Sequence, residues 1–108
     1  MADKQRLYRV TFFNQGHIYE VYAKSVLQGG LYGFVEIEQL VFGERSELVV
    51  DPAEEKLASE FADVIRSYIP MHAVVRIDEV RKRGAAKVTD AGGSDGKVMP
   101  FPVYTGRN

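Results

Sequence analysis

Two segments near the start of the chain alternate apolar and polar residues, as strands that bury one face do. In residues 7–13, the side chains of Tyr8, Val10 and Phe12 share one face of the predicted strand. Residues 17–26 are rich in aromatic and β-branched side chains, which favour a second strand. The intervening Asn-Gln-Gly suits a three-residue hairpin loop, because glycine adopts a left-handed backbone without strain. The pattern predicts a β-hairpin.

A third alternating segment, residues 34–42, changes character along its length. Glu36 and Glu38 share one face near its start, and apolar side chains occupy that same face near its end. We therefore expect a long, twisted strand that is covered at one end only. The glycine-rich residues 27–33 before it lack the Lys-Ser/Thr ending of a phosphate-binding loop, which favours a bend or bulge. A short strand is predicted at residues 47–50.

A helix is predicted to begin at the sequence Asp-Pro-Ala-Glu. Asp51 suits the N-cap, Pro52 the first helical position and Glu54 the third, where it closes a capping box. The helix is expected to end near Arg66, because Pro70 lies ahead and a proline disfavours helix in the residue before it. The apolar stripe that this helix places on the sheet is formed by Leu57, Phe61, Val64 and Ile65.

Alternation resumes over residues 71–80, which form the last predicted strand. His72 and Arg76 share one face of it. The side chains expected to face the core are Met71, Ala73, Val75 and Ile77. Together the elements predict an α+β domain, a bent five-stranded antiparallel sheet or small open barrel with one helix between strands four and five.

The periodicity ends at Gly84. Residues 84–108 hold five glycines and two prolines, which is typical of a flexible tail. We therefore expect a single domain over residues 1–83. Within the tail, residues 98–104 are more apolar than a simple spacer, which suits either a docking segment, onto this domain or onto a partner, or a disordered end without function.

Composition narrows the classes of protein. The chain has no cysteine, which excludes disulfides, thiolate catalysis and sulfur-based zinc sites. The N-terminus is charged, and no apolar run approaches the roughly 18 residues of a membrane helix. We expect a cytoplasmic protein with no membrane partner.

Charge is segregated along the chain, although the formal net charge is −1. Residues 36–63 hold nine acidic and two basic side chains. The cations gather from Lys4 to Arg9 and again from Arg76 to Lys87. Side by side, these two groups would form a basic patch. As solvated strand edges, they would instead hinder aggregation.

Candidates for catalysis are few. His17 follows the hairpin loop, and the local sequence fixes no carboxylate or hydroxyl near it. On a strand, Arg76 lies about 13 Å from His72, too far for a direct pair. Glu36 and Glu38 are close enough for paired carboxylate chemistry, but any such pair in a strand has that spacing. No nucleophile motif and no loop dense in metal ligands is present in the sequence, so we expect no cofactor, no metal and no catalytic residue.

A surface of aromatic and basic side chains is a second source of function. Such residues crowd into the first three predicted strands, a composition typical of surfaces that stack single-stranded bases. The aromatic core of a small β-domain has the same composition, so the outcome depends on which face is exposed. The candidate RNA-binding or ligand-binding residues are Tyr8, Arg9, Tyr22, His72, Arg76 and Arg81.

Three stretches within residues 8–80 resemble a small bacterial family catalogued as domain of unknown function 1820. They are YRVTFFNQGHIYEVYA, LYGFVEIEQLVFGERSELVVDPAEEKL and RSYIPMHAVVRIDEV. This resemblance implies a family but no particular activity.

A second resemblance is to the RNA cyclic-group end-recognition domain, and it implies RNA binding. Asn-Gln-Gly stands where that family has His-Arg-Gly, and Ala73 stands where it has an arginine. The residues that match its Ile-Pro-x-His strand are Tyr68, Ile69, Pro70, His72 and Ile77.

These observations favour a non-catalytic interaction or regulatory module with a protein partner. The partner is expected to bind through a sheet edge, the acidic helix face or the tail. An RNA-binding module is the second hypothesis. A small enzyme that uses His72 is the third.

Overall fold

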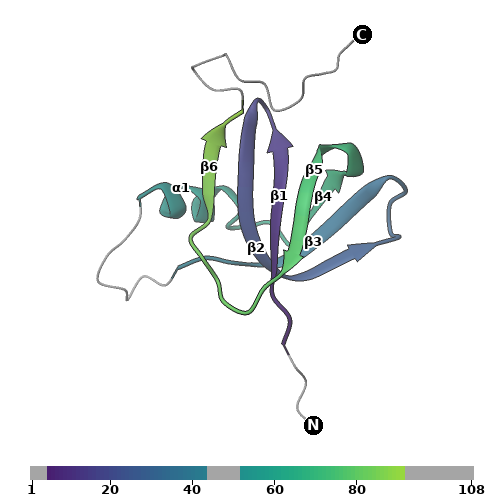
Figure 1. Cartoon of the computed structure of the whole chain (residues 1–108), viewed down its shortest axis with the longest axis horizontal. Coiled ribbons are helices and arrows are strands. Elements are labelled where there is room, and N and C mark those ends of the chain that lie inside the picture. Colours follow the sequence, from purple (N-terminus) through teal and green to yellow (C-terminus); the bar gives the residue numbers. More distant parts are fainter. Residues whose placement is uncertain (1–4, 44–51, 92–108) are drawn as a thin grey trace.

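The computed structural model describes residues 5–43 and 52–91, and residues 1–4, 44–51 and 92–108 lie outside the described part. One helix and a largely antiparallel sheet confirm the predicted α+β class (Figure 1). The elements in chain order are β1 (Tyr8–Asn14), β2 (His17–Gln28), β3 (Phe34–Val41), α1 (Pro52–Glu60), β4 (Arg66–Pro70), the 3-10 turn η1 (Met71–Ala73), β5 (Val74–Glu79) and β6 (Lys87–Asp90).

The sheet curls but does not close. Its strand order is β4-β3-β2-β1-β5, and β6 pairs with the start of β2. β4 and β5 stand at the two ends of this order, and η1 joins them in the chain. No pairing between them is found in the part of the chain that the structure describes. The bent sheet or open barrel expected from the sequence is confirmed in this open form.

The predicted hairpin of β1 and β2 is confirmed, with a tighter turn than expected. Asn14 pairs with His17, so the turn has two residues rather than three. Gln15 and Gly16 both have positive φ angles, 53° and 79°. A two-residue turn with two positive φ angles matches the right-handed twist of the flanking strands, whereas a type I or type II turn would splay them.

The long strand β2 changes the face that it buries. Ala23 and Val26 both pack in the core, although an uninterrupted strand would turn them to opposite faces. The opposite strand β3 changes face near the same place, because Gln39 has a φ angle of 58° and lies between Ile37 and Leu40, which both contact the core. This irregularity explains the change of character along residues 34–42 and bends the sheet.

Strand β4 corrects the predicted element order. The helix ends at Glu60 rather than near Arg66, and the next strand pairs with β3 over Arg66–Pro70. Among the described residues, the helix therefore lies between β3 and β4, and the sheet has six strands rather than five. The predicted strand at residues 47–50 lies outside the described residues. Pairing with β3 outweighs the local helical pattern, because it buries Ile69 to 8% exposure.

The last predicted strand is also corrected. Its first residues form η1, and Met71 is 45% exposed instead of facing the core. Val74 and Ile77 pack against the core, while Val75 is 52% exposed. The register of β1 with β5 shifts between Thr11 and Phe12. A bulge of this kind adds one residue to β5, so that Val74 replaces Val75 on the core side, whereas Ala73 and Ile77 pack against the core as predicted.

Residues beyond position 83 continue the ordered sheet. β6 pairs with the start of β2, and Ala86 before it is completely buried. Glu54 on α1 anchors this segment, since its Oε2 accepts hydrogen bonds from Arg83 (3.0 Å) and from the backbone N–H of Ala86 (3.2 Å). The sequence places the start of a flexible tail at Gly84, but the sheet extends to Asp90. The predicted docking segment at residues 98–104 lies outside the described part.

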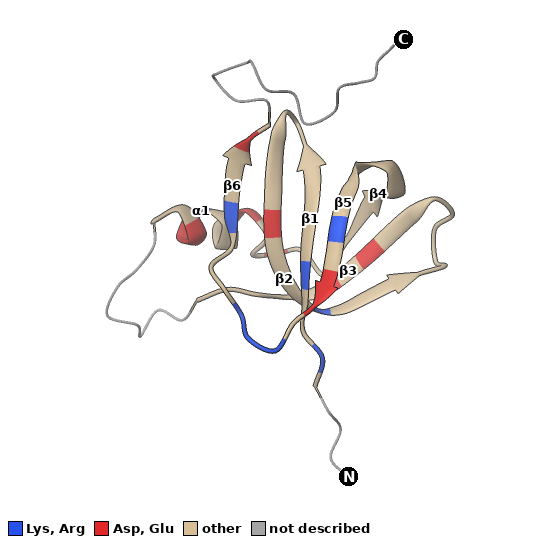
Figure 2. Ribbon diagram, in the orientation of Figure 1, with Lys and Arg blue, Asp and Glu red and all other residues tan. Residues whose placement is uncertain are grey.

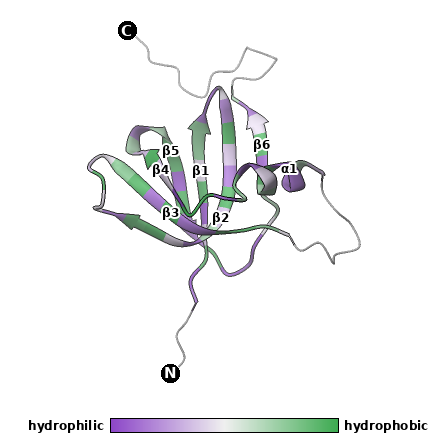
Figure 3. Ribbon diagram, turned by 180° about the vertical axis from the view of Figure 1, so that it is seen from behind, coloured by the Kyte–Doolittle hydropathy of each residue, from purple (hydrophilic) through white to green (hydrophobic). Residues whose placement is uncertain are grey.

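The core lies between the curled sheet and the helix. Val10, Val21 and Ile37 are essentially inaccessible to solvent, and Leu57 of α1 packs against the same cluster. Figure 3 shows α1 crossing the face of β2 and β6. Phe61 continues this contact after the helix ends. Val64 and Ile65, expected in the same apolar stripe, are instead 43% and 81% exposed.

Among residues 5–43 and 52–91, no helix is long and apolar enough to cross a lipid bilayer.

Candidate functional site

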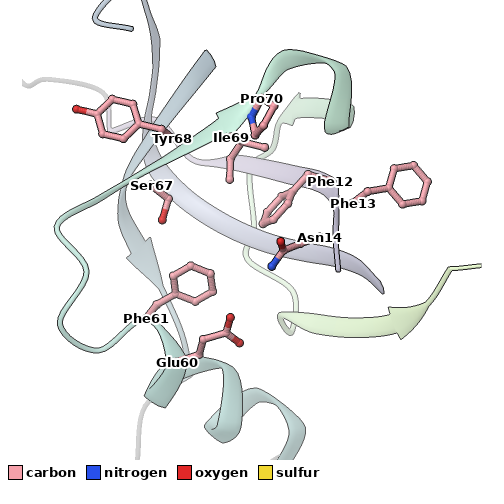
Figure 4. A pocket seen from close by; sticks show the side chains of 9 residues that line it. All are labelled: Phe12, Phe13, Asn14, Glu60, Phe61, Ser67, Tyr68, Ile69 and Pro70. Atoms are coloured by element: carbon pink, nitrogen blue, oxygen red, sulfur yellow. The ribbon is translucent and has the colours of Figure 1, made fainter. Parts of the chain in front are cut away.

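A cleft of about 230 Å³ opens between β4, the end of β1 and the end of α1. Figure 4 shows Glu60 and Phe61 at its helix end and Pro70 at the opposite end. Its walls combine aromatic and apolar side chains with polar groups of Asn14, Glu60, Ser67 and Tyr68. The lining residues are Phe12, Phe13, Asn14, Glu60, Phe61, Ser67, Tyr68, Ile69 and Pro70.

The cleft lies along the edge of β4 rather than on one of its faces. Four consecutive residues, Ser67 to Pro70, line it. Side chains of consecutive strand residues point to opposite faces of the sheet. A cavity reaches all four only where it meets the side of the strand. β4 is a terminal strand of the sheet among the described residues, so its second edge faces this cleft.

The register of β4 shows which backbone groups face outward. Met71 N–H donates to Gly33 O (2.9 Å), and the pairs with β3 continue through Pro70, Ile69 and Tyr68. Hydrogen-bonded and non-hydrogen-bonded pairs alternate along an antiparallel ladder, so the backbone groups of Pro70 and Tyr68 point away from β3. Tyr68 therefore presents both its N–H and its C=O at the edge. Pro70 presents only its C=O, because proline has no N–H.

Aromatic rings form the floor of the cleft. Phe12 stacks on Tyr19 with 5.2 Å between ring centroids. Phe61 meets the edge of Tyr19 at 6.5 Å. The Tyr19 hydroxyl donates to Glu60 Oε2 (3.1 Å). Burial, together with the negative charge of Glu60, raises the pKa of Tyr19, and a hydrogen bond with Asn14 partly opposes this. The cleft therefore combines apolar walls with one carboxylate held by a neutral hydroxyl.

Exposed apolar side chains lie beside the cleft. Ile65, just before β4, is 81% exposed, and Val64 and Tyr68 are nearly half exposed. Large apolar side chains gathered at an edge strand are typical of surfaces that bind another chain.

The outer face of β3 carries a carboxylate with an unsatisfied oxygen. Glu36 is 7% exposed, and its Oε2 has no hydrogen-bond partner among the described residues. Leu27 and Tyr68 are its direct neighbours on β2 and β4. A Cβ atom at Gly30 would overlap the Glu36 carboxylate, so glycine is required there while the side chain keeps this position.

The next carboxylate along β3 is paired. Glu38 accepts a hydrogen bond from Arg66 Nε on β4 (2.5 Å). This contact accounts for the raised pKa of Arg66. Glu36 and Glu38, a candidate carboxylate pair in the sequence, therefore occupy different environments on the same face.

At the opposite end of the sheet, the edge strand β5 carries a charge network. Asp78 accepts from Arg9 (2.7 Å) and from Arg76 (3.0 Å). The hydrogen bond from Arg9 is the main cause of the lowered pKa of Asp78. Val80 N–H donates to Leu7 O (2.8 Å), so by the same alternation the outward backbone groups of β5 belong to Ile77 and Glu79.

The predicted aromatic and basic residues do not form one exposed face. Tyr8 packs against the core, on the face opposite to Arg9. Tyr22 is 4% exposed, and its hydroxyl lies against Gly84. Arg9 and Arg76 share the carboxylate of Asp78.

The basic segments do meet at one end of the sheet. Leu7 and Val80 are hydrogen-bonded, which brings the N-terminal segment beside the loop that carries Arg81. Figure 2 shows basic positions of both segments at this end. The RNA-binding hypothesis therefore stays a prediction that rests on basic side chains rather than on exposed rings.

His72 lies in η1 with an exposed side chain and does not line the cleft. No hydrogen bond or ion pair joins it to a carboxylate of the described residues. His17, in contrast, gains a partner that the local sequence did not indicate, because β6 brings Asp90 within 3.2 Å. Within residues 5–43 and 52–91, no three acidic or histidine side chains gather closely enough to hold a metal ion.

The residues of the cleft were not predicted as a site. Phe61 was expected to contact the sheet, and the strand of Tyr68 was assigned to the end of the helix and its connection. The sequence Arg-Ser-Tyr-Ile-Pro does not alternate polar and apolar residues, and the strand-favouring Tyr68 and Ile69 are too few to separate a strand from a connection.

The chain matches the family model described as Domain of unknown function (DUF1820) over residues 6–103. It therefore belongs to this family, in agreement with the first resemblance. No curated protein and no solved structure gives a significant match. The resemblance to the RNA cyclic-group end-recognition domain is not supported by these comparisons.

Proposed function

We propose that this member of the DUF1820 family is a protein-binding module that accepts an extended segment of a partner as an added strand on β4. The observation that carries the proposal is the outward N–H and C=O of Tyr68 beside an apolar cleft. Addition of a strand supplies backbone hydrogen bonds for affinity, and pockets for alternate side chains supply selectivity.

The length of the β4 edge limits the partner segment. β4 has five residues, and Pro70 offers no N–H. Tyr68 is therefore the central residue that exchanges both hydrogen bonds with the incoming chain. A segment of a few residues is enough to cover the edge. The sheet would then extend across the open side between β4 and the end of β1.

The charges of β5 make it a poorer acceptor for such a segment. Asp78 and Arg76 lie on β5, and Glu79 ends it. Charged side chains on an edge strand hinder pairing with another chain, because pairing would remove them from water. The centre of β4, in contrast, is Ser-Tyr-Ile. The two edges of one sheet thus differ in the property that strand addition requires.

The test begins with a library of random linear peptides, from which those that bind the full chain are selected. Their dissociation constants are then measured for Tyr68→Ala and Tyr68→Pro. Both variants lose the phenol ring, but only the proline variant loses the outward N–H, and the ladder with β3 keeps its hydrogen bonds. We expect Tyr68→Pro to bind up to about tenfold more weakly than Tyr68→Ala, the effect of one lost hydrogen bond and a blocked edge.

Glu79→Pro is the matched control, because it removes an outward N–H from the β5 edge. It is expected to bind the selected peptides as the unchanged chain does. Circular dichroism and thermal melting establish that each variant is folded. Equal affinity of Tyr68→Pro and Tyr68→Ala, or failure of the library to yield any peptide, would refute binding at β4.

A further inference from the structure

Glu60 is the one carboxylate among the residues that line the cleft beside β4. Its carboxylate accepts from the Tyr19 hydroxyl, a neutral donor. No lysine or arginine among the described residues forms an ion pair with it. The remaining polar side chains, Asn14 and Ser67, are neutral. The cleft therefore offers the carboxylate of Glu60 beside aromatic side chains.

The register of β4 indicates which residues of an added strand would face this cleft. Ser67 and Ile69 pair with Ile37 and Val35, which are buried in the core. Tyr68 pairs with Glu36, on the outer face. Side chains alternate along a strand, and paired residues share a face. The residues of the partner on either side of the one opposite Tyr68 therefore direct their side chains toward the cleft.

We infer that one of these cleft-facing residues of the partner is a lysine or an arginine. Its methylene groups lie against Phe12 and Phe61, and its charged group reaches Glu60. This inference rests on the proposed addition of a strand at β4 and specifies the chemistry of the added segment.

The walls and the end of the cleft favour this class of side chain over others. Lysine and arginine combine an apolar stem with a charged end and bury the stem against apolar surface. The face of Phe61 also attracts a cation. An acidic side chain would meet Glu60 with like charge. A short apolar side chain would leave the carboxylate without a charged partner.

The experiment uses a peptide selected on the full chain that contains lysine. The lysine is replaced by norleucine, which keeps the stem and removes the charge. We expect the dissociation constant to rise about 1.5-fold to fivefold, the range for an ion pair with an exposed carboxylate such as Glu60. The same replacement is expected to change little when the protein carries Glu60→Gln. Glu55→Gln, an exposed position on the same helix, is the control and should keep the full preference for lysine.

The outcomes separate this inference from the proposed function. If Tyr68→Pro weakens binding but norleucine binds as well as lysine, strand addition stands and the cation preference is wrong. If the preference for lysine persists in Glu60→Gln, a different carboxylate is responsible and the assignment to Glu60 is wrong. If the selected peptides carry no lysine or arginine at a cleft-facing position, the inference also fails.

Discussion

Carboxylates in two parts of the molecule differ in their partners. On β5, Asp78 has two arginine partners, and on α1, Glu54 accepts from Arg83 and from the backbone of Ala86 just before β6. At the end formed by β3 and β4, Glu36 is buried with an oxygen that has no partner among the described residues. Buried polar groups are nearly always satisfied in folded proteins, so an exception calls for an explanation.

The difference separates carboxylates that join elements of the fold from groups near β4 that have no partner among the described residues. Asp78 joins β5 to Arg9 of β1, and Glu54 fixes the segment before β6 to the helix. The β4 end keeps an unsatisfied carboxylate, an edge with free hydrogen-bonding capacity at Tyr68 and exposed apolar side chains such as Ile65. Groups of this kind lower stability, and the proposed addition of a strand at β4 would satisfy the backbone groups of Tyr68. The following three predictions test this contrast.

Loss of the Glu54 carboxylate is expected to have the largest effect. Glu54→Ala removes the acceptor of both the Arg83 guanidinium and the buried Ala86 N–H. We expect the free energy of unfolding to fall by about 2–3 kcal/mol, because a buried donor loses its partner together with a charged contact. Urea denaturation measures this change. Glu55→Ala, exposed on the same helix, should stay within about 0.5 kcal/mol of the unchanged chain, and equal effects would contradict an anchoring role for Glu54.

Removal of the Glu36 carboxylate is expected to have the opposite sign. Glu36→Met keeps the length of the side chain between Leu27 and Tyr68 and removes the unsatisfied oxygen. We expect the free energy of unfolding to rise by about 1 kcal/mol. Glu38→Met is the matched comparison, since it deprives Arg66 of its partner and should lower stability by up to about 1 kcal/mol. A loss of stability in Glu36→Met would show that the carboxylate is satisfied in solution.

The smallest expected effect is the contribution of Asp78 to the pH dependence of the free energy of unfolding. Its pKa is lowered in the folded chain, mainly by the hydrogen bond from Arg9. A lowered pKa means that the ionised group stabilises the fold above its unfolded pKa, near 4, and that this contribution is lost as the pH falls through the folded pKa. The stability difference between the unchanged chain and Asp78→Asn should therefore be constant above about pH 5 and shrink in acid. A difference that grows toward acid would contradict this assignment.

The sequence determined the elements whose signals are local. The hairpin of β1 and β2 follows from alternation and a turn that contains Gly16, and the helix begins where Pro52 allows it. These features depend on residues close together in the chain, so periodicity and turn chemistry are sufficient to predict them.

Tertiary structure decided the elements whose signals are weak or shared. Arg66–Pro70 became a strand because β3 offers it a partner and a buried position for Ile69. The bulge opposite Phe12 turned Val74 rather than Val75 toward the core, and no pattern within β5 alone records it. Lys87–Asp90 joined the sheet because Glu54, far away in the chain, holds the segment before it.

The candidate site belongs to this second class. Tyr8 and Tyr22 were chosen as exposed rings from their composition, yet one packs in the core and the other lies against Gly84. Tyr68, with its outward N–H and C=O, could be recognised only once the register with β3 was known. The sequence by itself determined the class of the fold and its local turns, because those are set by neighbouring residues. The edges of the sheet, and therefore the surface available to a partner, were decided by long-range pairing.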